Sequence, residues 1–114
     1  MPKFLLILRG DPATWRARDK SAVLESVERF EAWAGRLLGE RRFVDGKKLA
    51  DGEGCVLRGD KVEHGPFGAG AEVVRGYHVI EADDYEHAVR LCVEHPELAD
   101  GGTVEVRRLA SMGE

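Results

Sequence analysis

The segment Lys3-Phe4-Leu5-Leu6-Ile7-Leu8 decides the fold of this chain of 114 residues. It is a nearly continuous apolar run, and Arg9-Gly10-Asp11-Pro12 closes it with charges and two residues that interrupt regular structure. A run this short suits a strand better than a helix, and apolar side chains at both odd and even positions indicate burial on both faces. The sequence therefore predicts a strand at the N-terminus that lies centrally in a sheet.

A first helix is predicted downstream of this strand. Asp19 or Ser21 would cap it by accepting a hydrogen bond from a free N–H of the first turn. Apolar residues between Leu24 and Leu38 then recur at spacings of three and four, which is the helical period. Gly39 is the predicted C-terminal stop of this helix.

A second helix is predicted in the C-terminal half. Asp83 is its expected N-cap, Glu86 completes a capping box, and Pro96 ends it. His87 and His95 would then both lie in this helix, two turns apart. That separation is too large for one metal ion, so the two histidines predict no metal site.

The remaining elements are expected to be strands. Cys55–Arg58 and Lys61–His64 flank a two-residue turn and predict a hairpin. Val73–Ala82 is rich in β-forming residues and contains Gly76, which marks a bulge or a close backbone approach. The segment from Thr103 to Leu109 alternates as a half-exposed strand does. Ten of the 14 glycines lie between positions 35 and 76, so the middle of the chain is rich in turns.

This order of elements over residues 1–114 predicts one α+β domain of the ferredoxin-like type, in which two helices cover one face of an antiparallel sheet. The other face of such a sheet stays open. The apolar runs at Phe4–Leu8 and Val79–Ile80 contain residues for both faces. Two copies would bury their open faces against each other, so we expect a homodimer.

Charge and cysteine usage exclude several classes of function. The net charge is −4, whereas a protein that binds nucleic acid would show a basic patch. We therefore expect no nucleic-acid partner. Cys55 and Cys92 match no metal or redox spacing, and their apolar neighbours indicate buried, reduced thiols. No phosphate-loop, zinc-protease or paired-cysteine motif occurs, so neither a metal nor a cofactor is expected. The N-terminal apolar run is too short for a signal sequence or a membrane span, which favours a cytoplasmic protein without a membrane partner.

The most informative polar residue lies where the hairpin enters a loop. His64 stands beside Glu63 and precedes Gly65, and Asp45 is a candidate to lie across from it. An imidazole there would serve as a general base, because its ordinary pKa is near 6.5. The alternative is an exposed or turn-capping histidine.

Three further side chains are open to two interpretations. His78 alternates with Tyr77 and Val79, so it points to the opposite face, where it lines a cavity between subunits or faces solvent. Trp15, in the polar connection before the first helix, covers a pocket or packs locally. Trp33 is expected to pack in the core or at its rim rather than to stack on a substrate.

Three stretches carry a resemblance to a known family. They are Val62-Glu63-His64-Gly65-Pro66-Phe67, the segment Glu72–Ala82, and Thr103-Val104-Glu105-Val106-Arg107. Over essentially the whole chain the sequence resembles the YCII-related family, and within it the branch named for its Asp-Gly-Pro-Phe motif. The resemblance implies a dimeric α+β barrel of ferredoxin-like subunits, with a cleft near the dimer interface.

One position departs from the motif of that branch. His64 stands where the motif has Asp, so no catalytic Asp is carried over unless Glu63 or Asp45 substitutes for it. In the parent branch a His and an Asp are the proposed polar pair. By resemblance, Gly65 and Pro66 fix the turn and Phe67 packs it, while Gly76 opens the following strand.

The leading hypothesis is a small-ligand-binding protein with a cleft near the dimer interface and weak acid/base catalysis by His64 and Asp45. The other residues expected to line the cleft are Arg9, Trp15, Glu63, Tyr77 and His78. The alternative is a non-catalytic regulatory or protein-interaction module associated with transcription.

Overall fold

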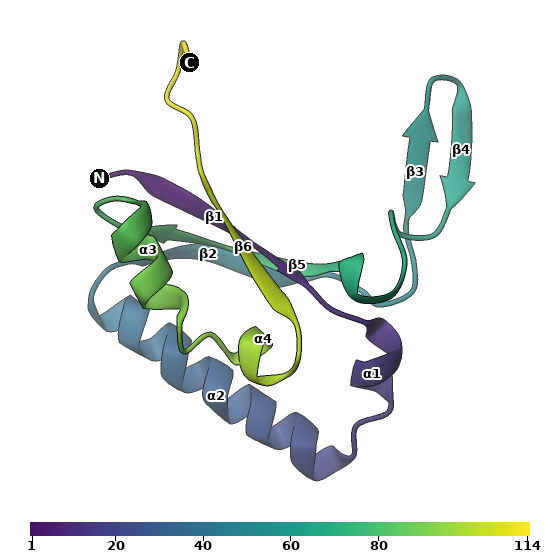
Figure 1. The fold of residues 1–114 in the computed structure, drawn as a ribbon, viewed down its shortest axis with the longest axis horizontal. Helices are drawn as coiled ribbons and strands as arrows, with labels where there is room; N and C mark the ends of the chain where they lie inside the picture. The colour runs from purple at the N-terminus through teal and green to yellow at the C-terminus, as the bar shows by residue number, and fades with distance from the viewer.

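The computed structural model describes residues Met1–Glu114. The elements follow one another as β1 (Lys3–Arg9), α1 (Pro12–Arg16), α2 (Lys20–Gly39), β2 (Phe43–Lys48), β3 (Cys55–Arg58), β4 (Lys61–His64), a 3-10 turn (Gly70–Glu72), β5 (Val74–Glu81), α3 (Tyr85–Cys92), α4 (Pro96–Ala99) and β6 (Thr103–Arg108) (Figure 1). No helix combines the length and the apolar character needed to cross a membrane.

Four strands form one antiparallel sheet in the order β2-β5-β1-β6. The N-terminal strand β1 lies inside this sheet, as its apolar run predicts. Strands β3 and β4 pair only with each other, and their hairpin projects away from the rest of the chain (Figure 1). The predicted α+β architecture of the ferredoxin-like type is confirmed.

The core lies between the sheet and the helices, all on one face. Side chains at alternate positions of β1 point toward α2 and α3, because successive side chains of a strand face opposite sides. Trp33 packs at the centre of this core, and its indole N–H donates to the carbonyl oxygen of Leu91 at 2.8 Å. Its predicted packing role is therefore confirmed. The buried cluster is Phe4, Leu6, Leu8, Trp33, Ala34, Leu37, Ile80, Ala82, Ala88 and Cys92.

Acidic residues cap the main helices, and one of the predicted caps is shifted. Asp19 caps α2 and accepts a hydrogen bond from the Ala22 N–H at 2.8 Å. The prediction of Asp83 as the cap of the second helix is wrong, because Asp84 accepts from the His87 N–H at 2.8 Å. Asp83 lies one residue earlier and donates its own backbone N–H to the His87 ring.

The second predicted helix is divided in two. Helix α3 ends at Cys92, and Pro96 begins the separate helix α4. His95 is therefore not in the second helix, as the sequence suggested, but is the N-cap of α4. The physical reason is that the residue before a proline is disfavoured in the helical conformation. The polar connection before α2 also forms a short helix, α1, which Asp11 caps.

The two cysteines differ in their environments. Cys92 is buried against the core, as predicted. Cys55 is exposed, so its predicted burial is wrong. The reason is that the β3–β4 hairpin, which carries Cys55, leaves nearly all of its residues in contact with solvent.

Candidate functional site between the sheet and α2

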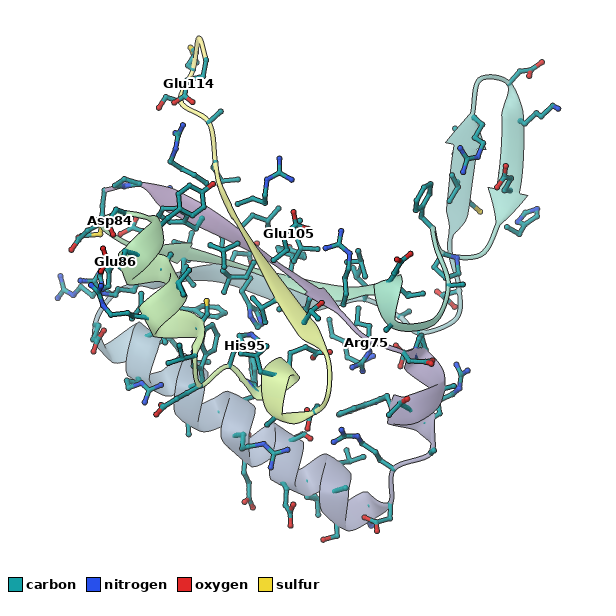
Figure 2. All side chains as sticks on the ribbon, viewed as in Figure 1. Arg75, Asp84, Glu86, His95, Glu105 and Glu114 are labelled. Carbon is teal, nitrogen blue, oxygen red and sulfur yellow. The ribbon has the colours of Figure 1, made fainter.

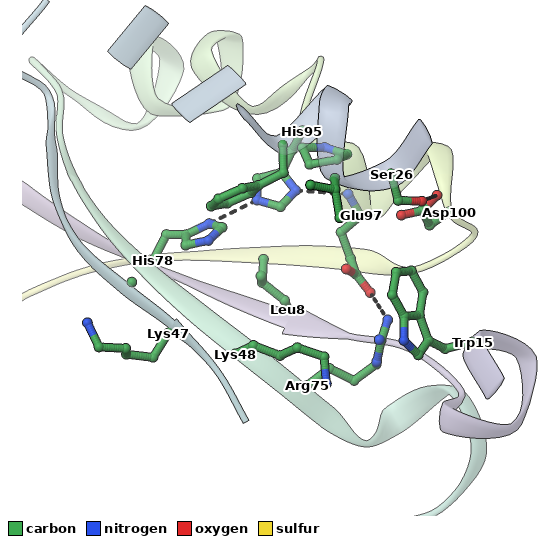
Figure 3. Close-up of a pocket in the computed structure, with 15 residues that line it drawn as sticks. Leu8, Trp15, Ser26, Lys47, Lys48, Arg75, His78, His95, Glu97 and Asp100 are labelled. Carbon is green, nitrogen blue, oxygen red and sulfur yellow. Dashed lines mark hydrogen bonds and ion pairs between the residues drawn. The ribbon is translucent and has the colours of Figure 1, made fainter. Parts of the chain in front are cut away.

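A cavity of about 380 Å³ lies between the sheet and α2, close to α4. This volume is in the range of small-molecule sites. Its apolar wall comes from Leu8, Trp15, Val27 and Phe30. Its polar wall comes from residues of β5, of α4 and of the turns on either side of α4, and Figure 3 shows them converging on the same space: Arg75, His78, His95, Glu97 and Asp100.

Two buried histidines form a hydrogen-bonded pair in this wall. The His95 Nε2 and His78 Nδ1 atoms are 3.0 Å apart, and the Glu97 backbone N–H donates to His95 Nδ1 at 3.0 Å (Figure 3). A backbone N–H can only donate, so a neutral His95 carries its proton on Nε2 and donates it to His78 Nδ1. A neutral His78 then carries its own proton on Nε2. Hydrogen-bond donation therefore runs in one direction, from the Glu97 backbone N–H through His95 and His78 to the cavity.

Burial keeps both histidines neutral at neutral pH. Desolvation lowers the pKa of His78 from 6.5 to about 4. Desolvation also lowers the pKa of His95 to about 3, and the neighbouring His78 adds to that shift. Only 5% of His78 is exposed, and its ring packs against Phe30 and Trp33. The expectation that His78 faces solvent is wrong, because its face of β5 is the one that the helices cover, and the cavity that it lines is formed within one chain.

A glycine on the neighbouring strand makes room for His78. Gly46 of β2 pairs with His78 in the sheet, and a Cβ at Gly46 would lie 2.4 Å from His78 Cδ2 and 3.0 Å from the Tyr77 carbonyl oxygen. No real side chain fits at that distance. The position of the imidazole therefore depends on a residue without a side chain.

A β-bulge directs Arg75 into the same cavity. Leu8 pairs with Gly76 and Arg9 with Val74, so Arg75 is the extra residue of β5. Such bulges change the direction of a side chain. A Cβ at Gly76 would lie 2.9 Å from the Lys47 carbonyl oxygen, so the predicted bulge and the predicted close approach both occur.

The Arg75 guanidinium is buried but incompletely bonded. Its Nη1 donates to Glu97 Oε1 at 3.1 Å, and its Cζ lies 4.6 Å from the centre of the Trp15 ring (Figure 3). Its Nε has no hydrogen-bond partner, and the Asp51 Oδ1 is 3.9 Å away, beyond hydrogen-bonding range. Burial raises the pKa of the Glu97 carboxyl, and the charge of Arg75 offsets that effect only in part.

A second polar cluster closes the cavity beside α4. Asp100 Oδ1 accepts from Arg18 at 2.7 Å, from Arg29 at 2.8 Å and from the Ser26 hydroxyl at 2.8 Å. Burial alone would raise the pKa of Asp100, but these hydrogen bonds outweigh it and hold the pKa below its ordinary value. The cluster joins α2 to the turn after α4 and fixes one end of the cavity.

The structure separates the residues that the sequence grouped into one site. Only Trp15 and His78 line the cavity. Tyr77, Asp45 and Arg9 lie on the opposite, open face of the sheet, where the Tyr77 hydroxyl donates to Asp45 Oδ2 at 3.3 Å.

The other residues of that predicted group lie on or next to the projecting hairpin. Glu63 pairs with Arg58 at 2.9 Å, and His64 Nδ1 is 3.7 Å from Cys55 Sγ. Gly65 has a φ of 106°, which suits a turn that favours glycine. Pro66 follows it, and Phe67 is exposed with the Arg58 guanidinium 5.4 Å above its ring.

Sequence reasoning missed Arg75, His95, Glu97 and Asp100. One signal for His95 was available, since a residue directly before Pro is a natural helix N-cap position. Figure 2 shows Arg75 and His95 within the body of the domain, whereas the hairpin that carries the sequence motif lies outside it.

Comparisons with known proteins show a likeness in structure and none in sequence. The chain matches no protein-family model, and it matches no curated protein by sequence. Its structure is similar to that of 5-chloro-2-hydroxyhydroquinone dehydrochlorinase from Burkholderia phenoliruptrix in complex with 2,5-dihydroxybenzoquinone. The TM-score is 0.58 and the sequence identity is 14%, over 95% of this chain and 93% of that one. At this identity the likeness establishes the fold alone.

Proposed function

We propose that this chain binds a small organic molecule in the cavity between the sheet and α2, with His78 in contact with the ligand. The observation that carries the proposal is the directed pair of buried, neutral histidines, which ends on His78 Nε2 at the cavity. Burying two imidazoles is costly, and clusters of strongly shifted pKa values in a cavity are characteristic of functional sites.

The structural neighbour supports a ligand of this size. That protein is named for its action on a chlorinated hydroxyhydroquinone and was solved with a dihydroxybenzoquinone, a single planar ring. A ring of that kind would fit between Phe30 and the polar wall of a 380 Å³ cavity. The motif resemblance supports the further proposal that the chain is a YCII-related protein of the Asp-Gly-Pro-Phe branch.

A thermal-shift and calorimetric screen of planar oxygenated compounds tests the proposal. The first probe is 2,5-dihydroxybenzoquinone, used with a Cys55→Ser background so that addition of the exposed thiol to the quinone does not contribute. We expect His78→Asn to weaken binding about tenfold. Asn still accepts from His95 near the position of Nδ1, but it lacks the Nε2–H that faces the ligand.

His87→Asn is the matched control, because His87 is on α3 and does not line the cavity. It should leave the affinity unchanged. If His64→Gln abolishes binding while His78→Asn does not, the ligand site lies at the hairpin, as the sequence suggested. If no compound binds in the cavity, the alternative of a regulatory or protein-interaction module is favoured instead.

We also propose that two copies of the chain pair through the open face of the sheet. The centre of this face is formed by Leu5, Ile7, Tyr77 and Val79, which no helix covers. We expect Ile7→Asp to convert a dimer into a monomer, because it places a charge in the apolar centre of the interface. Sedimentation equilibrium measures the change. A wild-type chain that is monomeric at micromolar concentration would contradict the pairing.

A further inference from the structure

The polar groups in the wall of the cavity indicate the class of ligand that it binds. This inference rests on the proposed function. We propose that the cavity binds a small planar oxyanion, a carboxylate or an enolate, with its charged oxygen at Arg75 and a second oxygen at His78 Nε2–H. Both side chains come from β5, three residues apart, and both line the same cavity.

The direction of the histidine pair determines which ligand groups His78 can bind. The Glu97 backbone N–H fixes the proton positions on both rings, so His78 offers a donor to the cavity. A neutral His78 arranged in this way has no free nitrogen to take a proton from a ligand. Its complement is a hydrogen-bond acceptor, and an oxygen that carries negative charge is the strongest acceptor available.

Arg75 is an incompletely bonded cation in the wall of the cavity. Its side chain is 8% exposed and its Nη1 donates to Glu97 at 3.1 Å, while Asp51 Oδ1 stays 3.9 Å from the buried Nε. A buried arginine normally has its donors satisfied, because each unpaired one costs free energy. Trp15 covers one face of the guanidinium, so the group is also held in place. A planar oxyanion in the cavity would give this guanidinium a further acceptor.

Positive charge is in excess at this end of the cavity. Four cationic side chains face three carboxylates, so the set carries one net positive charge. The cations are Arg18, Arg29, Lys48 and Arg75, and the carboxylates are Asp51, Glu97 and Asp100. One monovalent anion would balance the set. The apolar wall formed by Leu8, Val27 and Phe30 would then contact the uncharged body of the ligand.

Matched pairs of anionic and neutral probes test this inference by calorimetry near neutral pH. The carboxylate arm compares 4-hydroxybenzoate with 4-hydroxybenzamide, and the enolate arm compares 1,3-cyclohexanedione with cyclohexanone. We expect the anion to bind at least about tenfold more tightly than its neutral partner in one arm, which also identifies the type of oxyanion.

Two variants with opposite expected effects separate a binding role from a structural one. Arg75→Gln should weaken anion binding about tenfold, because it removes the cation. Glu97→Gln should strengthen anion binding, because it removes the competing carboxylate but keeps the backbone N–H that orients His95. A merely structural role for this ion pair would weaken binding in both variants. If Arg75→Gln fails to fold, Arg75→Lys keeps the charge and should keep the preference for the anion.

The possible outcomes distinguish this inference from the proposed function. If neutral probes bind as tightly as the anions and their binding still requires His78, the proposed preference for an oxyanion is wrong. The proposal that the cavity is the ligand site would then still stand. Binding weakened in both Arg75→Gln and Glu97→Gln would also overturn it. Failure of every probe to bind in the cavity would remove both proposals.

Discussion

Replacement of Trp33 by alanine is expected to lower the free energy of unfolding by about 3 to 5 kcal/mol, which is the range for removing a buried aromatic side chain. Trp33 is 1% exposed, donates to the Leu91 carbonyl oxygen and packs edge-on against the His95 ring at 4.5 Å. Its loss leaves a large void in the core and an unpaired carbonyl. Urea unfolding followed by circular dichroism measures the change.

Leu38→Ala on the same helix is the comparison for Trp33, because Leu38 is 59% exposed and lies outside the buried cluster. That variant should lower the free energy of unfolding by well under about 1 kcal/mol. Trp33→Phe should recover part of the stability, since it restores volume but not the hydrogen bond to Leu91. A loss in Trp33→Ala no larger than that in Leu38→Ala would show that Trp33 does not hold the helix layer to the sheet.

Acidification from about pH 6.5 to about pH 4 is expected to destabilise the fold by roughly 3 kcal/mol through His78 alone. The unfolded chain protonates His78 near pH 6.5, whereas desolvation lowers the pKa in the folded state to about 4. Over that interval the unfolded state binds more protons than the folded state. The contribution of neutral His78 to the free energy of unfolding is therefore fully present above pH 6.5 and is lost as the pH falls toward 4. His95 extends the loss to about pH 3.

Unfolding free energies of wild type and His78→Asn, measured across this interval, test the prediction. The pH dependence of the variant should be clearly flatter, because it lacks one of the two groups that must stay neutral. The raised pKa of Glu97 acts in the opposite direction near its own titration and is common to both proteins. The variant also loses the part of the His95 pKa shift that His78 causes, and this second effect flattens the curve in the same direction. His87→Asn should follow the wild-type curve. Parallel curves for wild type and His78→Asn would contradict the burial of a neutral imidazole.

The fold was predictable because its signals are local. The apolar run of β1, the periodic apolar residues of α2 and the acidic caps each act within a few residues. The division of the second helix at Pro96 was harder to foresee, since a proline ends one helix as readily as it begins the next. That ambiguity placed His95 on the wrong element.

The candidate site was less predictable because it depends on tertiary contacts. His78 and His95 come together only when the α4 region packs against β5, and Arg75 enters the cavity only through a β-bulge. By contrast, a sequence motif predicted a functional role for His64, and the structure places this residue on a projecting hairpin. Of the residues predicted to line the cleft, only Trp15 and His78 line the cavity, which Gly76, predicted for a structural role, also borders.

The proposed site depends on a directed hydrogen-bond relay that presents His78 Nε2–H to the cavity. Long-range proton–nitrogen NMR correlations of the imidazole rings near neutral pH test this relay. We predict that His78 and His95 both carry their proton on Nε2 and that both rings stay neutral. Binding of a small ligand should then shift the His78 Nε2 resonance most strongly. A proton on Nδ1 of either ring, or a charged imidazolium at either position, would contradict the relay and the site built on it.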